Sequence, residues 1–182
     1  MNLQDAQAEF RRGFISGAPG VLASALAWFA AAFTAWRISP EQSIWVLFIG
    51  GMLIYPAGLV IAKLLGASGA ASKANPLTPL AMATTFWLMF SLPIAYVVSL
   101  YRIELFFSAM LLVIGGRYLT FGALYGMRAF WVLGFALAGA GFALAYFNAP
   151  VAFAAVAGAS IEVLFALVMF VLHARWRRAN LT

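Results

Sequence analysis

Cysteine is absent from this chain, and charged side chains are scarce. Of its 182 residues, 9% are charged, five are Asp or Glu, and one is histidine. Without a thiol, the protein can form no disulfide and no thiolate metal site, and cysteine catalysis is excluded. Soluble domains carry about 25% charged residues, so this chain has too few polar side chains to cover a surface that faces water. Because 65% of its residues are hydrophobic, we expect an integral membrane protein.

The motifs of common catalytic sites are missing as well. The sequence contains no HExxH motif, no paired carboxylates and no glycine-rich phosphate loop. Its one histidine, His173, stands beside Arg175 at the end of the last apolar run, where we interpret it as an interfacial residue. A serine or threonine nucleophile would need a base, and Glu162 is the one acidic residue within an apolar run. We therefore expect no enzyme, no cofactor and no metal site.

The formal net charge of +6 comes from basic residues that punctuate the apolar runs. Charges placed in this way are typical of topology signals in membrane proteins, whereas a nucleic-acid-binding surface gathers them on one face. We expect a lipid bilayer as the surrounding partner, and no nucleic acid.

Six apolar runs approach the roughly 20 residues that a helix needs to cross a bilayer core of about 30 Å. Turn-forming sequences such as "RISPEQS", "GASGAASKANPLTP" and "FNAP" separate them. The predicted fold class is all-α, one membrane domain over residues 1–182, with three tandem antiparallel hairpins near 14–66, 77–126 and 129–174. The spans are placed near Ser16–Trp36, Ile44–Leu65, Pro79–Leu100, Leu105–Tyr125, Trp131–Phe147 and Val151–Leu172.

Basic residues indicate the orientation of these spans. An even number of spans puts both termini on one side, and most basic residues fall on that side. Only Arg37 and Arg102 fall on the other. The positive-inside rule then predicts that the termini, 1–13 and 175–182, lie in the cytoplasm and that the protein resides in the cell membrane. The basic residues on the side of the termini are Arg11, Arg12, Lys63, Lys73, Arg128, Arg175, Arg177 and Arg178.

An internal repeat supports the hairpin arrangement. A shift of 65 residues aligns "RISPEQSIWVLFIGGMLIYPAGL" with "RIELFFSAMLLVIGGRYLTFGAL", including the pairs Gly50-Gly51 and Gly115-Gly116. In this alignment Arg117 takes the place of Met52, so the charge is an addition to an apolar framework. Parallel repeats of this kind recur in transporters, and also in proteins that transport nothing.

Arg117 is a permanent cation in the middle of a span, and Glu162 is a carboxylate near the middle of another. An arginine at a helix centre costs about 2.5–3.5 kcal/mol on insertion scales, so it normally faces the bundle interior and pairs. The two spans run in the same direction, which places Arg117 and Glu162 at a similar depth. We predict an intramembrane salt bridge between them, and greater harm from Glu162→Ala than from Met52→Ala.

Helical spacing selects the neighbours of this predicted polar centre. Val113, Ile114, Thr120, Phe121 and Leu124 share the face of Arg117. Thr120 and Tyr118 are candidates to complete the hydrogen bonds of the pair, and Trp28 or Trp87 is a candidate cation–π partner. Core filling is the alternative for both tryptophans. The pair itself is either a lock that fixes which helices are neighbours or part of a solute or ion pathway.

Three functions remain open from these residues. The first is a small solute- or ion-handling protein in which a small anionic solute binds Arg117. The second is a membrane scaffold, whose small-residue faces recruit a helix of a partner or of a second copy. The third is the substrate-binding subunit of an energy-coupled importer that docks through the alanines of the first span, although its outer loops are short for a lid. Small residues recur at four-residue spacing at Gly13, Gly17, Gly20, Ser24, Ala23, Ala27 and Ala31, and again at Gly122, Gly126, Gly134, Ala138, Gly141 and Ala145.

The segments "GAPGVL", "FIGGMLIYP", "NPL", "TFWL", "LPIAY" and above all "AMLLVIGGRYLTFGALYG" resemble a bacterial family of small multi-span membrane proteins. The resemblance covers most of the chain. It implies an architecture of about six helices, and no activity, because none is assigned to the family.

Overall fold

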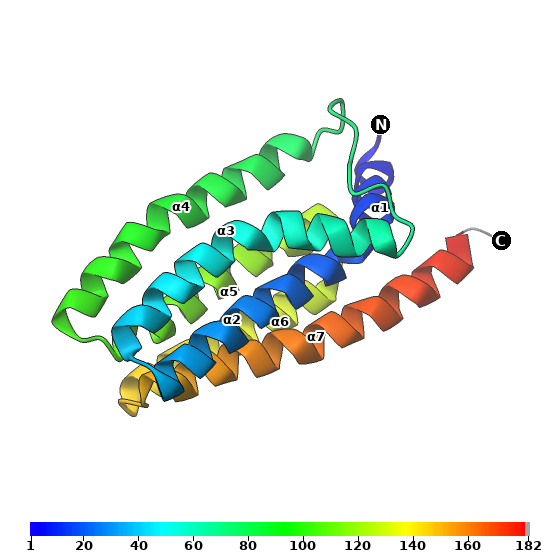
Figure 1. Cartoon of the computed structure of the whole chain (residues 1–182). Coiled ribbons are helices and arrows are strands. Elements are labelled where there is room, and N and C mark those ends of the chain that lie inside the picture. Colours follow the sequence, from blue (N-terminus) through cyan, green and yellow to red (C-terminus); the bar gives the residue numbers. More distant parts are fainter. Residues whose placement is uncertain (181–182) are drawn as a thin grey trace.

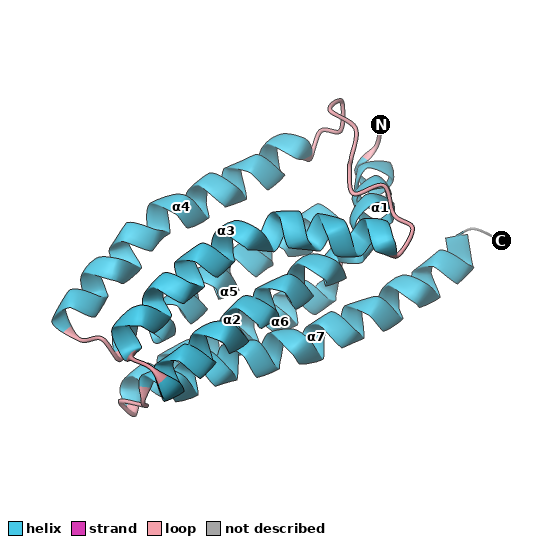
Figure 2. Ribbon diagram, in the orientation of Figure 1, coloured by secondary structure: helices cyan, strands magenta, loops and turns pink. Residues whose placement is uncertain are grey.

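The computed structural model describes residues 1–180, which form helices and no strand (Figure 2). Six helices in this range are long and apolar enough to cross a membrane, which indicates a multi-pass membrane protein. The predicted all-α class is confirmed, and the predicted spans match the six long helices closely at most ends. The elements are α1 (Leu3–Phe14), the 3-10 turn η1 (Ile15–Gly17), α2 (Ala18–Arg37), α3 (Pro40–Leu64), α4 (Thr78–Tyr101), α5 (Leu105–Tyr125), α6 (Arg128–Tyr146) and α7 (Val151–Asn180).

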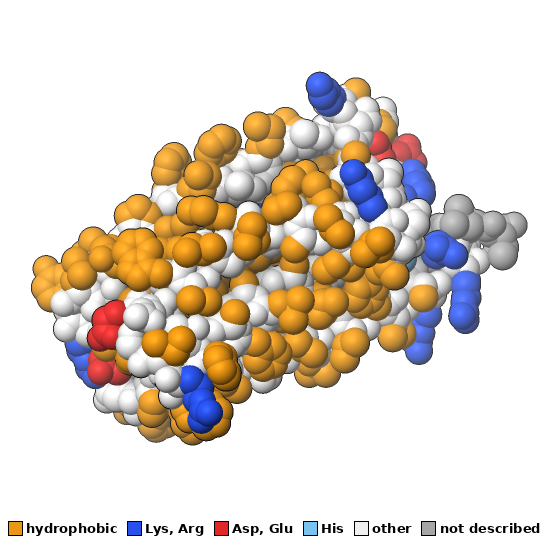
Figure 3. Space-filling model, viewed as in Figure 1, with side chains coloured by type: hydrophobic (Ala, Val, Ile, Leu, Met, Phe, Trp, Pro, Cys, Tyr) orange, Lys and Arg blue, Asp and Glu red, His pale blue; other side chains and the backbone are white. Residues whose placement is uncertain are grey.

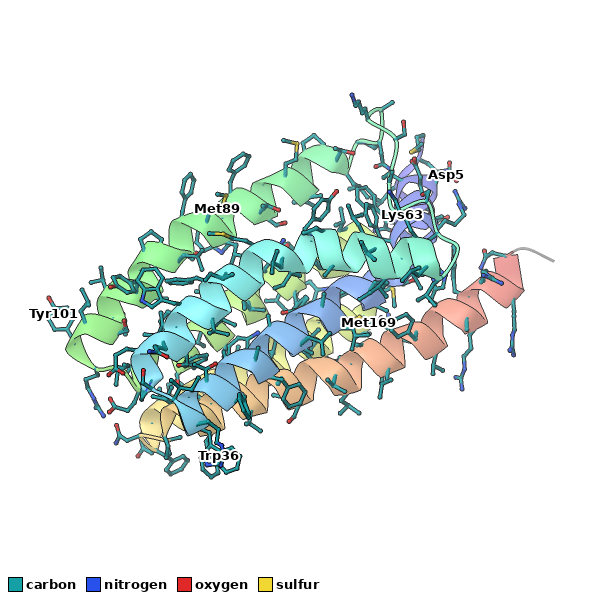
Figure 4. The ribbon with its side chains drawn as sticks, in the orientation of Figure 1. Asp5, Trp36, Lys63, Met89, Tyr101 and Met169 are labelled. Carbon is teal, nitrogen blue, oxygen red and sulfur yellow. The ribbon has the colours of Figure 1, made fainter. Side chains whose placement is uncertain are left out.

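Charged side chains occupy the two ends of the elongated bundle. Apolar side chains cover the flank between them (Figure 3). Both termini lie at one end, beside the connection from α3 to α4 (Figure 1). At the opposite end Trp36 and Tyr101 project away from the helices (Figure 4). An apolar band with polar ends is the surface that a bilayer requires. Of the predicted C-terminal segment 175–182, residues 181–182 lie outside the described part of the chain.

Helix α2 lies at the centre of the packing. It packs along α3 on one side and α7 on the other, while α5 packs against α6 and α4. Small residues make these approaches close: a Cβ on Gly50 would stand 2.8 Å from the Cβ of Ala27, and a Cβ on Gly158 would stand 2.8 Å from the Trp28 ring. Most of the small-residue positions that the sequence offered to partner helices are therefore in contact within the chain, whereas Gly20 has open space around it. The buried members on α2 are Ala23, Ser24, Ala27 and Ala31.

The two glycine pairs of the repeat are used in different ways. Gly50 faces α2, its own hairpin partner, whereas Gly115 faces α6, with a Cβ there only 2.7 Å from the carbonyl oxygen of Gly134. The second glycine of each pair, Gly51 or Gly116, has open space around it. In both places the first glycine lets another helix approach closely. The two repeats therefore share this close contact, but the helix that makes it is α2 in one and α6 in the other.

Helices α3 and α4 meet at one end and separate toward the other (Figure 1). Near the α4–α5 connection the ring of Tyr96 lies 5.9 Å from that of Trp45 and 6.3 Å from that of Phe48. Elsewhere α4 packs closely on α5 and not on α3. Interior prolines, Pro56 in α3 and Pro93 in α4, stand in the two diverging helices. A proline removes one backbone hydrogen bond and bends a helix.

Most of the predicted N-terminal tail, residues 1–13, is helical in the structure and forms most of α1. Asn2 caps α1 by accepting a hydrogen bond from the Asp5 amide at 2.8 Å. Ala6, Phe10 and Gly13 are buried along one face, a spacing that predicts an amphipathic helix. The left-handed conformations of Ser16 (φ 54°) and Gly17 (φ 79°) then turn the chain into α2. With four charged residues in twelve, α1 is too polar to be part of an apolar span.

Helix α1 also holds the long connection between α3 and α4. The Glu9 carboxylate accepts hydrogen bonds from the Ser72 amide at 2.6 Å and from the Asn75 side chain at 2.8 Å. The Gly69 amide donates to the carbonyl of Gly13 at 2.9 Å. These donors, the Ser72 amide first, lower the pKa of Glu9 below its ordinary value. The segment is therefore held by α1 in addition to its own turns, such as the hydrogen bond from the Leu77 amide to the Asn75 side chain.

Candidate functional site

Arg117 lies in α5 on the wall of a cavity enclosed by α1, α2, α3, α4 and α5. The cavity measures about 200 Å³. Its lining is mostly apolar, and Ile114, Phe121 and Leu124 from the helix face of Arg117 are part of it, whereas Val113 and Thr120 from that face are not. Tyr55 also lines it and is 68% exposed. The cavity therefore reaches the outer surface of the bundle beside α3.

The guanidinium of Arg117 has few partners. Its central carbon lies 5.2 Å from the Phe121 ring centroid, within cation–π range. One terminal nitrogen is 3.5 Å from the hydroxyl oxygen of Thr85 on α4, a long hydrogen bond. Its Nε is buried and has no hydrogen-bond partner among the described residues. A half-buried cation with so little compensation is the main electrostatic feature of the cavity.

The predicted salt bridge between Arg117 and Glu162 is not formed. Within residues 1–180, the one salt bridge joins Arg102 and Glu104 at 3.9 Å, at an exposed end of the bundle. Glu162 is fully buried, and its Oε1 accepts a hydrogen bond from the Tyr118 hydroxyl at 2.9 Å. Its Oε2 finds no hydrogen-bond donor in the described part of the chain. The hydrogen-bond partner of the carboxylate is thus the neutral phenol of Tyr118 and not the guanidinium of Arg117.

The geometry of one helix turn explains this outcome. Successive residues of an α-helix point about 100° apart, so Arg117 and Tyr118 cannot both face α7. Tyr118 faces inward, where its ring stacks on Phe130 with centroids 6.0 Å apart. Arg117 is then turned toward α4 and the cavity. The sequence indicated that this part of α5 and Glu162 lie at a similar depth. At that depth the residue that reaches the Glu162 carboxylate is Tyr118 and not Arg117.

The other residues predicted for the site lie apart from the guanidinium. Thr120 donates to the Arg117 backbone carbonyl at 2.6 Å, so it satisfies its own helix and not the predicted pair. Trp87 is 59% exposed on α4. Trp28 is fully buried, with its ring centroid 5.7 Å from that of Phe107. Both tryptophans were expected as alternatives for a cation–π contact, and Phe121 makes that contact instead, because it lies one turn along α5 from Arg117.

Sequence reasoning missed four polar residues of the cavity. Tyr55, Thr85, Tyr125 and Ser24 all line it, and Ser24 also lies beside the Glu162 carboxylate. Ser24 was interpreted only as a small residue, and Thr85 stands in an apolar run without a motif. Helical spacing within α5 carries no information about α2, α3 or α4. For this reason these residues become neighbours of Arg117 only through packing.

Comparison with known proteins gives one match. No curated protein matches the chain, and no solved structure does. Residues 3–172 match a family whose description is "Family of unknown function (DUF7010)". The match begins at the start of α1, covers α2 to α6 and ends within α7. The chain therefore belongs to this family of unknown function.

Proposed function

We propose that this protein binds a small organic anion with an apolar tail in the cavity beside Arg117, and that the guanidinium is the counter-ion. The single observation that carries the proposal is a half-buried arginine, in a mostly apolar cavity, with no carboxylate at ion-pair distance within residues 1–180. Solute handling in a membrane is the function class to which such a site belongs.

The energetics favour an external anion. A cation at mid-membrane costs about 2.5–3.5 kcal/mol on insertion scales, and here a single ring and a long bond to Thr85 offset only part of that cost. A carboxylate that entered the cavity would form a charge-assisted, bidentate pair with the guanidinium. The cost of desolvating the Arg117 guanidinium is incurred when the protein folds. Binding of the anion does not incur it again, so the preorganised site binds more tightly.

The lining supports an anion of amphipathic character. Ile54, Leu88 and Phe121 offer apolar contact, while Tyr55 and Thr85 offer hydroxyl groups near the charge. Small-molecule sites commonly combine an apolar wall with a few convergent polar groups. Since the cavity lies where α3 and α4 diverge, a molecule would enter from the side, between these two helices.

We further propose that the protein resides in the cell membrane with both termini in the cytoplasm, and that it is not an enzyme. Eight basic residues stand toward the end that carries the termini, which supports this orientation by the positive-inside rule. In this proposal the Tyr118 hydroxyl is held by Glu162, and the tyrosine forms part of the cavity wall beside Arg117. Most of the small-residue positions on which the scaffold and importer alternatives depended are in contact within the chain.

A thermal-shift titration of the purified full chain tests the proposal. Short- and medium-chain carboxylates should raise the melting temperature saturably, whereas the corresponding alcohols should not. At a ligand concentration of 100 Kd the stabilisation amounts to about 2.7 kcal/mol. In Arg117→Gln the carboxylate effect should vanish, because the amide keeps the hydrogen-bonding groups and loses the charge.

Arg102→Gln is the matched control, since it removes an arginine at the exposed end of the bundle. This variant should respond to carboxylates as the parent protein does. Equal shifts with alcohols and carboxylates, or unchanged shifts in Arg117→Gln, would contradict the proposal.

A further inference from the structure

A second cavity, independent of Arg117, lies at the end of the bundle that carries the termini. It measures about 460 Å³ and is formed by α1, η1, the residues after α3, and the last turns of α7. Its charged side chains are Arg12, Arg177 and Arg178, and no acidic residue among residues 1–180 lines it. We infer that this cavity binds the phosphate headgroup of an anionic phospholipid.

The arginines come from elements far apart in the sequence. Arg12 belongs to α1, and Arg177 and Arg178 belong to α7. Packing holds these elements together: Ser16 in η1 lies 2.9 Å from the Nδ1 of the buried His173, and the Arg11 guanidinium lies 5.6 Å from the Trp176 ring centroid. The convergence of the charges is therefore fixed by the fold, and it does not depend on mobile tails.

Helix dipoles offset only part of this positive charge. The C-termini of α1, α3 and α7 point toward this end, and each carries about −0.5 charge. Arg12 and Arg177 alone contribute two positive charges to the lining, more than that sum of about −1.5. Glu9 on α1 interacts electrostatically with Arg12, but its carboxylate is bonded to Ser72 and Asn75 and does not line the cavity. The charged side chains that line the cavity within the described part of the chain are all basic, so an anion bound among them is electrostatically favoured.

The arrangement of apolar and basic residues indicates a lipid in preference to free phosphate. Ile15, Leu65 and Phe170 line the same cavity as the arginines, and Trp176 stands with them. Tryptophan at this position is typical of the headgroup level of a bilayer. A phospholipid likewise has a phosphate group next to an apolar acyl region, so its phosphate would meet the arginines and its acyl chains the apolar residues. Basic pockets between membrane helices recognise lipid headgroups through this combination.

Native mass spectrometry of the detergent-solubilised full chain tests the inference with three probes: phosphatidylglycerol, zwitterionic phosphatidylcholine and inorganic phosphate. One copy of phosphatidylglycerol should bind saturably, and phosphatidylcholine should bind more weakly. The double variant Arg12→Gln/Arg177→Gln should lose affinity by a factor on the order of 25, since each basic residue near a membrane surface is worth about fivefold.

Two comparisons keep this result specific. Arg37→Gln/Arg102→Gln makes the same charge change at the opposite end and should retain binding. Ala67→Phe fills the cavity and keeps every arginine, so it should weaken binding even if the double variant folds poorly. Undiminished binding in Ala67→Phe, equal loss in the two double variants, or displacement of the lipid by millimolar inorganic phosphate would overturn the lipid site.

Discussion

Arg117 and Tyr118 are adjacent in α5 and point about 100° apart, and both line the cavity. Arg117 reaches the cavity, and Tyr118 reaches the fully buried carboxylate of Glu162. The tyrosine ring belongs to a cluster with Phe121 and Phe130, with ring centroids 5.7 and 6.0 Å away. The cluster holds the phenol in place, so the hydroxyl is directed at one acceptor. The cationic and anionic groups of the membrane interior are in this way kept apart by a neutral ring.

Substitutions at Glu162 should separate hydrogen bonding from ion pairing. Glu162→Ala leaves the buried Tyr118 hydroxyl without an acceptor and opens a cavity, which should lower the free energy of unfolding by about 2–5 kcal/mol. Glu162→Gln keeps an acceptor oxygen and should lower it by much less. The measurement is denaturant unfolding in detergent, with Met52→Ala, at a 76% exposed site, as the control. A Gln variant as unstable as the Ala variant would show that the charge of Glu162 matters, contrary to the observed geometry.

At the scale of elements, α1 acts as a clamp at the end of the bundle. The Arg11 side chain donates to the carbonyl of Tyr125 at 2.6 Å and also to that of Gly126. Gln7 donates to the carbonyl of Ala123 at 2.7 Å. These carbonyls end α5 and have no partner within their own helix, and a cation there also complements the helix dipole. The helix that bears Arg117 is therefore held at its C-terminus by α1.

The hydrogen bonds by which Glu9 of α1 holds the connection from α3 to α4 should depend on pH. The pKa of Glu9 is lowered by its hydrogen bonds with Ser72 and Asn75. Its stabilising effect is therefore present above the ordinary glutamate pKa and is lost as the pH falls through the lowered folded value. Because the chain has no cysteine, a spin label at Lys73→Cys can report on the segment.

Label mobility should rise on acidification through that range, and it should be high at every pH in a Glu9→Gln background. Glu104→Gln, which changes a carboxylate at the opposite end, should leave the acid transition in place. A mobility independent of pH in the parent protein would contradict the Glu9 contact.

At the scale of the whole molecule, the two ends differ in charge and in construction. One end carries α1, the long connection and both termini, whereas the other has only short turns (Figures 1 and 2). Among the side chains labelled in Figure 4, Asp5 and Lys63 lie at the first end, and Trp36 and Tyr101 lie at the second. The divergence of α3 from α4 leaves the cavity nearer the first end.

Cysteine labelling should reveal the same asymmetry in cells. Asn2→Cys and Lys73→Cys belong to the end with the termini, and we expect both to be protected from a membrane-impermeant thiol reagent in intact cells and to react after permeabilisation. Gln42→Cys and Asn148→Cys belong to the other end and should react in intact cells. Reaction of Asn2→Cys before permeabilisation would reverse the proposed orientation.

Much of this architecture was predictable, because apolar run length and turn residues are local properties. The span Leu105–Tyr125 matches α5 residue for residue, and Val151 begins α7 as predicted. Helix α1 could also have been predicted from the sequence, because Asn2 is a typical helix cap and Ala6, Phe10 and Gly13 have the spacing of one helix face. It was missed because its charged residues were interpreted only as topology signals.

The helical class, the six apolar helices and the residues on the helix face of Arg117 could all be predicted from the amino-acid sequence. Those properties follow from composition and from the 3.6-residue period of the backbone. Only the tertiary structure decided which neighbour each face meets. Close contact at Gly115 sets α5 against α6, which turns Tyr118 to Glu162 and Arg117 to the cavity. The rotation of a helix about its axis depends on contacts with other helices, and a single helical period contains no information about them.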